Sequence, residues 1–252
     1  MYVSARAPQA LEGVLTNAQR LARGFPLLKP RRRSNFPRQS TPSAVAPLQV
    51  TCNIHVSPTN SGSQGPTGWF MQSMGGNGIF YGVQMSQSDG NALVVSFSYT
   101  PGSTSHFPML ASTTLYSQYP YMAAIISADS DSNDLSSAST NYAFFGKSGD
   151  VPEGRPSPNT ANSYSDATST YGVGVETALW SYDPATRVLT PSWINDNGQR
   201  VPAYLMYDTW DGKFFVAGQS SVESSPVFLN GGLPMTFTCL DVVPIVPPDE
   251  TR

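Results

Sequence analysis

The segment that decides the fold runs from residue 177 to residue 217 and reads TALWSYDPATRVLTPSWINDNGQRVPAYLMYDTWDGKFFVA. Runs of apolar and β-branched residues alternate in it with three turn signals, Asp183-Pro184, Asn197-Gly198 and Asp211-Gly212. Asn-Gly and Asp-Gly are strong hairpin signals, because both central residues of the tight turn need a positive φ. The segment therefore predicts an antiparallel meander with strands at residues 177–182, 188–195, 202–207 and 213–217.

The same alternation of strands and turns continues through the rest of the body. In residues 93–99, the side chains of Val95, Phe97 and Tyr99 alternate with polar serines, which is the period-2 pattern of a half-buried strand. Further strands are expected at residues 49–56, 68–72, 78–85, 92–99, 121–127, 141–145, 227–229 and 234–243.

This pattern predicts an all-β domain over residues 49–246, followed by a disordered tail at residues 247–252. With about ten to twelve short strands and no helix expected in the body, the favoured architecture is an antiparallel two-sheet β-sandwich, resembling a jelly roll. A propeller would need a repeated blade motif, and the Trp-Ser-Tyr-Asp-Pro pattern occurs only once.

Charge is distributed unevenly along the chain. Residues 1–49 contain eight basic residues and one acidic residue (+7), and the remainder contains six basic and sixteen acidic residues (−10), which together give a net charge of −3. An acidic body argues against a nucleic-acid-binding surface. Nucleic acid is therefore an unlikely partner of the body, and any contact with a polyanion would fall to the N-terminal arm.

The first 48 residues predict a basic, largely disordered, leader-like segment that contains one short helix. Apolar residues recur at helical spacing within residues 10–25, and Gly24 and Pro26 end the pattern. The Pro-, Ser- and Gln-rich tract that follows has too little apolar surface to fold. Three interpretations of Arg31, Arg32 and Arg33 stay open: a processing site for a dibasic-specific protease, a solvated charge run in a linker, or a nucleic-acid-binding arm.

The two cysteines, Cys52 and Cys239, lie near the two ends of the predicted domain. If the first and last strands are neighbours, a disulfide would close a loop of almost the whole domain and stabilise it by roughly 4–5 kcal/mol. Such a bond implies an oxidising compartment, and the alternative is two unrelated buried thiols. Residues 1–23 nevertheless lack the apolar core of a signal peptide, and no stretch predicts a membrane span.

No arrangement of residues is recognisable as a catalytic or metal site, and no cofactor is predicted. His55 and His106 lie near no nucleophile motif and do not form a zinc pattern with the cysteines. The acidic run at residues 129–134 offers oxygen ligands but lacks the glycine and distal glutamate of a calcium loop, which favours a solvated loop. Glycoside hydrolysis needs two carboxylates; Glu176 and Glu223 are candidates, although no spacing selects them.

Aromatic side chains remain as candidates for binding, because their rings present a flat apolar surface to a sugar. Core burial is the competing interpretation. Burial is favoured for Trp180 and Trp193, which alternate with polar residues inside predicted strands. Trp210 sits at a turn, where exposure is expected. The sequence thus proposes Trp210, Trp69 and Tyr119 as sugar contacts.

Two segments resemble a group of uncharacterised secreted proteins of mushroom-forming fungi. Residues 16–24 match a Thr-Asn-x-x-Arg-x-Ala-Arg-Gly leader that precedes an arginine cluster, and residues 180–184 match a Trp-x-x-Asp-Pro hairpin segment. The resemblance implies secretion and an extracellular or cell-wall setting, and it supplies no activity.

The leading functional prediction is a secreted or cell-wall-associated, non-enzymatic protein that is structural or weakly carbohydrate-binding. Its expected partner is a cell-wall polysaccharide, and no membrane partner is expected. Two alternatives stay open. One is a capsid-type jelly roll whose Arg-rich arm contacts nucleic acid, and the other is a glycoside hydrolase.

Overall fold

The computed structural model describes residues 15–29, 45–60, 62–219 and 232–242. The chain divides into two units, Met1–Ala44 and Val45–Arg252. The arginine cluster at residues 31–33, the predicted strand at residues 227–229 and the tail at residues 247–252 lie outside the described residues.

In the first unit, residues 15–29 are described, and they contain the short helix α1 (Asn17–Ala22). Its N-terminus is a capping box, in which the Thr16 hydroxyl accepts from the backbone N–H of Gln19 and the Gln19 side chain accepts from the backbone N–H of Thr16. This arrangement satisfies two backbone donors that a helix start leaves without partners. Within the described residues, no helix has the length and apolar character needed to cross a membrane.

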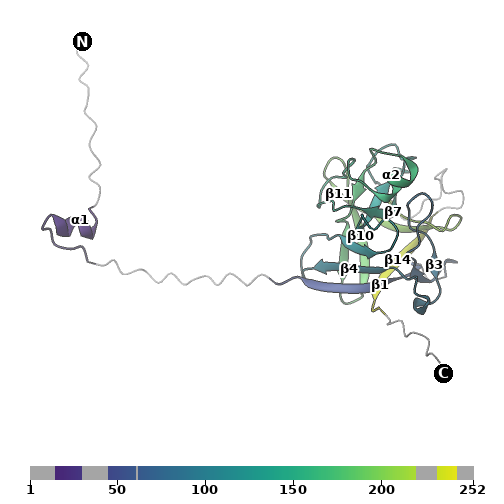
Figure 1. Ribbon diagram of the computed structural model, residues 1–252, viewed down its shortest axis with the longest axis horizontal. Coiled ribbons are helices and arrows are strands. Elements are labelled where there is room, and N and C mark those ends of the chain that lie inside the picture. The colour runs from purple at the N-terminus through teal and green to yellow at the C-terminus, as the bar shows by residue number, and fades with distance from the viewer. Residues whose placement is uncertain (1–14, 30–44, 61, 220–231, 243–252) are drawn as a thin grey trace, which may run out of the picture. The chain divides into compact units, whose positions relative to one another are not determined.

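The second unit is an all-β domain that closes into an eight-stranded antiparallel barrel, and the predicted two-sheet sandwich is wrong in this respect. Closure occurs because β14 pairs with β1 from Asn53↔Leu240 to Pro58↔Met235, and Figure 1 shows these two strands side by side. In order around the barrel, the strands are β1 (Leu48–Pro58), β4 (Val94–Tyr99), β5 (Met109–Ser112), β6 (Tyr121–Ile126), β7 (Tyr142–Ser148), β13 (Phe214–Ala217), β12 (Tyr204–Asp208) and β14 (Gly232–Leu240).

The difference between sandwich and barrel has a simple physical origin. Both architectures bury one face of each strand, so both produce the same alternation of apolar and polar residues along the sequence. The pairing of the first strand with the last decides between them, and this pairing is a contact between segments far apart in the chain.

The remaining elements of the second unit are not strands of this ring. The strands β9 (Trp180–Asp183), β10 (Val188–Ile194) and β11 (Arg200–Pro202) form two successive hairpins, and β10 also pairs with the end of β14. The others are β2 (Gly68–Phe70), β3 (Val83–Gln84), β8 (Val175–Glu176), the 3-10 helix η1 (Gln87–Asp89) and the helix α2 (Ser163–Thr168).

The helix α2 corrects the expectation of a body without helices. It is only six residues long and shows no apolar periodicity, so the sequence contains no helical pattern there. Its start is instead fixed locally, because the Asn162 side chain accepts a hydrogen bond from the backbone N–H of Ser165 at 2.8 Å.

Large side chains fill the interior of the barrel. Trp180 from β9 stacks on Phe145 and Phe237, with ring centroids 5.5 and 6.2 Å apart. Trp180 and Trp193 are both fully buried, which confirms the predicted core burial of these two residues. An eight-stranded barrel has an interior just wide enough for side chains to fill. Side chains thus occupy the interior of this barrel.

The segment between β7 and β9 covers part of the outer wall of the barrel. Val151 and Val175 pack against Ala123 and Ile125 of β6 in a second hydrophobic cluster. Tyr164 of α2 packs against this cluster and also against a third cluster on the outer faces of β7, β12 and β13. The covering segment is thus anchored by apolar contacts, and its remaining side chains form surface features.

The predicted disulfide is present between Cys52 on β1 and Cys239 on β14, with their Cα atoms 5.4 Å apart. It spans 187 residues, so the covalent loop encloses nearly all of the second unit. In the chain-entropy model, a loop of this length stabilises the folded state by about 5 kcal/mol.

Candidate functional site

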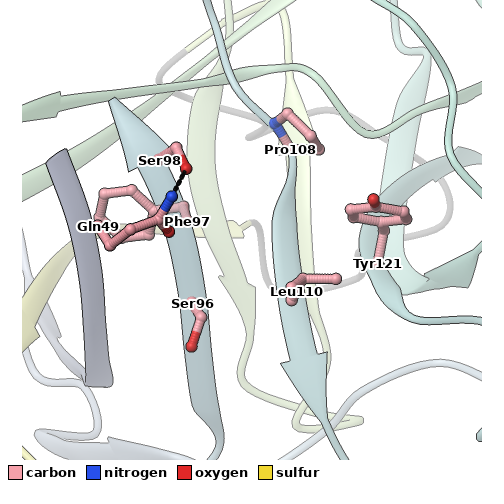
Figure 2. Close-up of a pocket in the computed structure, with 7 residues that line it drawn as sticks. All are labelled: Gln49, Ser96, Phe97, Ser98, Pro108, Leu110 and Tyr121. Carbon is pink, nitrogen blue, oxygen red and sulfur yellow. Dashed lines mark hydrogen bonds between the residues drawn. The ribbon is translucent and has the colours of Figure 1, made fainter. Parts of the chain in front are cut away.

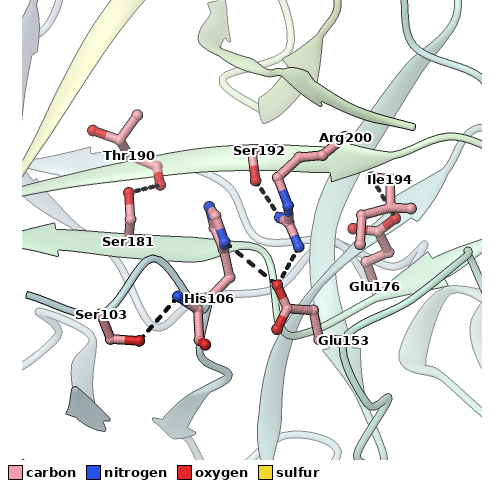
Figure 3. A network of polar contacts seen from close by, with 10 residues as sticks. Ser103, His106, Glu153, Glu176, Ser181, Thr190, Ser192, Ile194 and Arg200 are labelled. Carbon is pink, nitrogen blue, oxygen red and sulfur yellow. Dashed lines mark hydrogen bonds and ion pairs between the residues drawn. The ribbon is translucent and has the colours of Figure 1, made fainter. Parts of the chain in front are cut away.

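A network of polar side chains links β10 and β11 to the loops that precede β5 and follow β7 (Figure 3). At its centre, Glu153 forms an ion pair with Arg200, and its Oε1 lies 3.6 Å from Nδ1 of His106. Arg200 also donates to the hydroxyl of Ser192. Figure 3 shows the contacts from His106 and Arg200 converging on the same carboxylate.

Glu176 on β8 lies at the edge of this network and is only 3% exposed. Its Oε1 accepts a hydrogen bond from the backbone N–H of Ile194 at 2.9 Å. Burial raises the pKa of the Glu176 carboxyl to about 8, and this effect outweighs the opposing influences of the Ile194 hydrogen bond and the Arg200 charge. Glu176 is therefore mostly protonated at neutral pH.

A carboxyl with a raised pKa beside a second carboxylate is the combination that glycoside hydrolysis uses. The geometry here gives a sugar no access to it. Glu176 is buried, one of its oxygens is occupied by the Ile194 N–H, and none of the cavities described below is lined by Glu153 or Glu176. The other predicted carboxylate, Glu223, lies outside the described residues.

The imidazole of His106 belongs to the same network of charges. Burial lowers the pKa of its imidazole, the nearby Arg200 charge lowers it further, and Glu153 opposes both effects. The network connects the β9–β11 hairpins to the loops before β5 and after β7. Its contacts therefore hold these segments together.

An uncharged groove of about 190 Å³ crosses the outer wall of β4, β5 and β6 (Figure 2). One side is formed by Gln49, which donates a hydrogen bond to Ser98, and the other side by Tyr121. Ser96 and Leu110 lie between them. The groove offers amide and hydroxyl groups, but its one lining tyrosine is partly buried.

A larger feature surrounds Tyr171, which is 74% exposed. This residue and Gly172 line two cavities, one of about 520 Å³ and one of about 250 Å³, which therefore adjoin at the tyrosine. We call the two cavities together the Tyr171 cleft. Polar side chains contribute to both walls: Ser130, Asp131, Asn133 and Asp196 in the larger cavity, and Asn159 and Asp166 in the smaller one.

Hydrogen bonds hold the wall of the larger cavity in place. The Asn133 amide donates to the carboxylate of Asp196 at 3.3 and 3.4 Å, and its Oδ1 accepts from the backbone N–H of Gly174 at 3.1 Å. The Asp134 carboxylate accepts from the backbone N–H of Asp196 at 2.7 Å. Residues 130–133 of the acidic run thus form part of the wall of the cleft. Within the described residues, no group of three or more His, Cys, Asp and Glu side chains is placed to hold a metal ion.

The structure places the three predicted sugar-contact residues on different elements. Trp210 lies in the turn between β12 and β13 and is 78% exposed. Trp69 on β2 is half-buried and packs edge-on against His55, with ring centroids 5.1 Å apart. Tyr119 donates from its hydroxyl to Asp166 at 2.8 Å, so it supports the wall of the smaller cavity.

Tyr171 was missed as a candidate by the sequence-based prediction, although a usable signal was present. It lies between Thr170 and Gly172 in a segment without strand periodicity, which is the same kind of setting that predicted exposure for Trp210. The sequence offers no comparable signal for the two cavities beside Tyr171. Their walls are formed by segments that are separate in the chain, residues 126–133, 158–173 and 196.

Comparisons of the chain with protein-family models, with curated proteins and with solved structures gave no match. The fold and the surface together define a disulfide-closed, eight-stranded antiparallel barrel with a polar cleft on its outer wall.

Proposed function

We propose that the protein is a non-enzymatic carbohydrate-binding barrel that acts outside the cell, with the Tyr171 cleft as its binding site. The observation that carries the proposal is the exposed Tyr171 ring between two cavities that both carry polar side chains. A ring of this kind can stack on the apolar face of a sugar, while nearby polar groups hydrogen-bond with the sugar hydroxyls and fix its orientation.

The size of the cleft favours a polymer over a single sugar. Because the two cavities adjoin at Tyr171, a chain lying over the ring has polar partners on both sides of it. A cell-wall polysaccharide fits this arrangement. The Cys52–Cys239 disulfide supports the extracellular setting, because such bonds persist in oxidising compartments.

The position of Glu176 favours binding over hydrolysis. Among the carboxyl groups of the described residues, only that of Glu176 has a strongly raised pKa. It lines neither cavity of the Tyr171 cleft, and it is buried. A bound sugar at Tyr171 would therefore not meet the acid that hydrolysis needs.

The test is binding of the full chain to a panel of cell-wall polysaccharides, measured by co-sedimentation and by calorimetry with soluble oligomers. Tyr171→Ala is expected to weaken binding about tenfold, which corresponds to the loss of one stacked ring. Its unfolding midpoint should stay at the wild-type value, because the side chain is exposed.

Two exposed aromatic residues outside the cleft serve as matched controls. Tyr204→Ala on β12 and Trp210→Ala in the β12–β13 turn each remove an exposed ring that lines neither cavity. Both variants should bind as the wild type does. The proposal is overturned if no polysaccharide binds, or if Tyr171→Ala binds with unchanged affinity.

A further inference from the structure

We infer that the Tyr171 cleft selects cationic glycans, meaning polymers of amino sugars whose amines are free. The inference rests on the proposed function and adds the charge of the ligand to it. The preference for a charged ligand is assigned to the side chains that flank the ring. Binding of the sugar is assigned to the ring and to the two cavities.

Carboxylates are the only charged side chains among the described residues that line the cleft. Asp131 and Asp196 line the larger cavity and Asp166 lines the smaller one, and all three are exposed. No lysine, arginine or histidine of the described residues lines either cavity. A glycan that carries carboxylates or sulfates would therefore meet charges of its own sign on both sides of Tyr171.

The three carboxylates differ in whether they already accept a hydrogen bond from another group of the protein. Asp196 accepts from the Asn133 amide, and Asp166 accepts from the Tyr119 hydroxyl. The carboxylate of Asp131 has no hydrogen-bond partner in the described part of the chain, where only its backbone N–H is engaged, by Asn141. Asp131 is thus the carboxylate most available to an ammonium group of a ligand.

The surroundings of the cleft strengthen the same preference. Asp129 and Asp134 lie in the same loop as Asp131, and Asp134 contacts the backbone of Asp196. Arg155 is the exception: its side chain lies against Gly198, close to the Asp196 turn, but it lines neither cavity. The carboxylates of Asp131, Asp196 and Asp166 line the cavities themselves, so they are the charged groups that a bound ligand meets directly.

The placement of the acids on both sides of the ring suits a polymer with an amine on each sugar. When one sugar stacks on Tyr171, its neighbours along the chain extend into the two cavities, where one side offers Asp131 and Asp196 and the other offers Asp166. Each ion pair at an exposed site contributes little binding energy. The contributions of several such pairs then add along one ligand chain.

The experiment compares three oligosaccharides of equal length with the full chain by calorimetry in mildly acidic buffer of low ionic strength. The probes are an oligomer of glucosamine, an oligomer of N-acetylglucosamine, and an oligomer of a uronic acid. The first two share one backbone and differ mainly in charge. We expect the glucosamine oligomer to bind about tenfold more tightly than its acetylated counterpart, and the uronic acid oligomer to bind most weakly.

Variants separate the charge of the cleft from the charge of the whole protein. Asp131→Asn combined with Asp196→Asn keeps the size of both side chains and should reduce the preference for the glucosamine oligomer to the part that Asp166 supplies, while binding of the acetylated oligomer remains. Asp89→Asn removes an exposed carboxylate on η1, which does not line the cleft, and should keep the preference.

The outcomes distinguish the two proposals. Equal affinity for the first two probes, or equal effects of Asp89→Asn and of the double variant, overturns the charge inference and leaves carbohydrate binding standing. If none of the three probes binds and the polysaccharide panel is also negative, the proposed function fails together with the inference. A preference that survives added salt also contradicts the inference, because exposed ion pairs are screened by salt.

Discussion

At the scale of single residues, Glu176 shows how burial changes the chemistry of a side chain. Its carboxyl has an ordinary pKa of 4.5, which burial raises to about 8 in the folded protein. Between these two values the folded state holds a proton that the unfolded state releases. The contribution of Glu176 to stability is therefore fully present below pH 4.5 and is lost as the pH rises through 8.

We predict that the free energy of unfolding falls as the pH rises from 6.5 to 8, by up to about 1.4 kcal/mol per pH unit. This window lies above the ordinary pKa of histidine, 6.5, so the lowered pKa of His106, which has the opposite sign, contributes little in it. Glu176→Gln keeps an acceptor for the Ile194 N–H and should remove the slope.

Urea unfolding at a series of pH values measures this dependence. Asp89→Asn, which changes an exposed carboxylate on η1, serves as the control and should keep the wild-type slope. If Glu176→Gln unfolds with the same pH dependence as the wild type, the carboxyl of Glu176 does not hold the proton.

At the scale of elements, the loop before β3 packs tightly against α2. Gly78 has φ = +72°, and a Cβ atom on it would lie 2.1 Å from the backbone oxygen of Ser163. The Ser163 hydroxyl in turn donates to the carbonyl of Gly78 at 2.6 Å. Two segments far apart in the chain are thus in backbone contact, and a side chain at residue 78 would separate them.

The matched pair Gly78→Ala and Gly102→Ala tests this contact. Gly102 has a similar φ of +77°, but a Cβ atom on it would have no neighbouring atom within 4 Å, so its substitution costs only the backbone strain, about 1–2 kcal/mol. Gly78→Ala should destabilise the protein by about 1–3 kcal/mol more, because the backbone must move. Equal losses of stability for the two variants in urea unfolding would show that the loop and α2 do not pack as described.

At the scale of the whole molecule, the disulfide and the β1–β14 pairing act together to close the barrel. The bond joins adjacent strands, so it adds little to the geometry of the folded state and mainly restricts the unfolded chain. We predict that Cys52→Ser combined with Cys239→Ser lowers the free energy of unfolding by about 2–5 kcal/mol.

Urea unfolding of the double variant and of reduced wild-type protein should give similar losses, since both lack the covalent bond. The far-ultraviolet circular dichroism of the folded variant should stay that of a β protein, because hydrogen bonds close the barrel independently of the sulfur atoms. An unchanged stability after reduction would contradict the role assigned to the bond.

Much of this architecture could be predicted from local patterns, and the exceptions are informative. The alternation in residues 93–99 and the turn signals after Asp183 and Asp196 predicted strands that the structure contains, β4, β9 and β10. The four-residue strand β5 was not predicted, because Met109–Ser112 is too short for its alternation to stand out beside Pro108. The helix α2 depends on a cap rather than on apolar periodicity, so periodicity in the sequence does not predict it.

The sequence by itself determined the all-β class and the burial of Trp180 and Trp193, because period-2 alternation is a local property of the chain, and it left the Cys52–Cys239 disulfide as one of two alternatives. Only the tertiary structure decided that the strands close into a barrel and that residues 126–133, 158–173 and 196 meet around Tyr171. The reason is that closure and cleft are both made by contacts between distant segments. Such contacts produce no periodic pattern in the sequence of either segment alone.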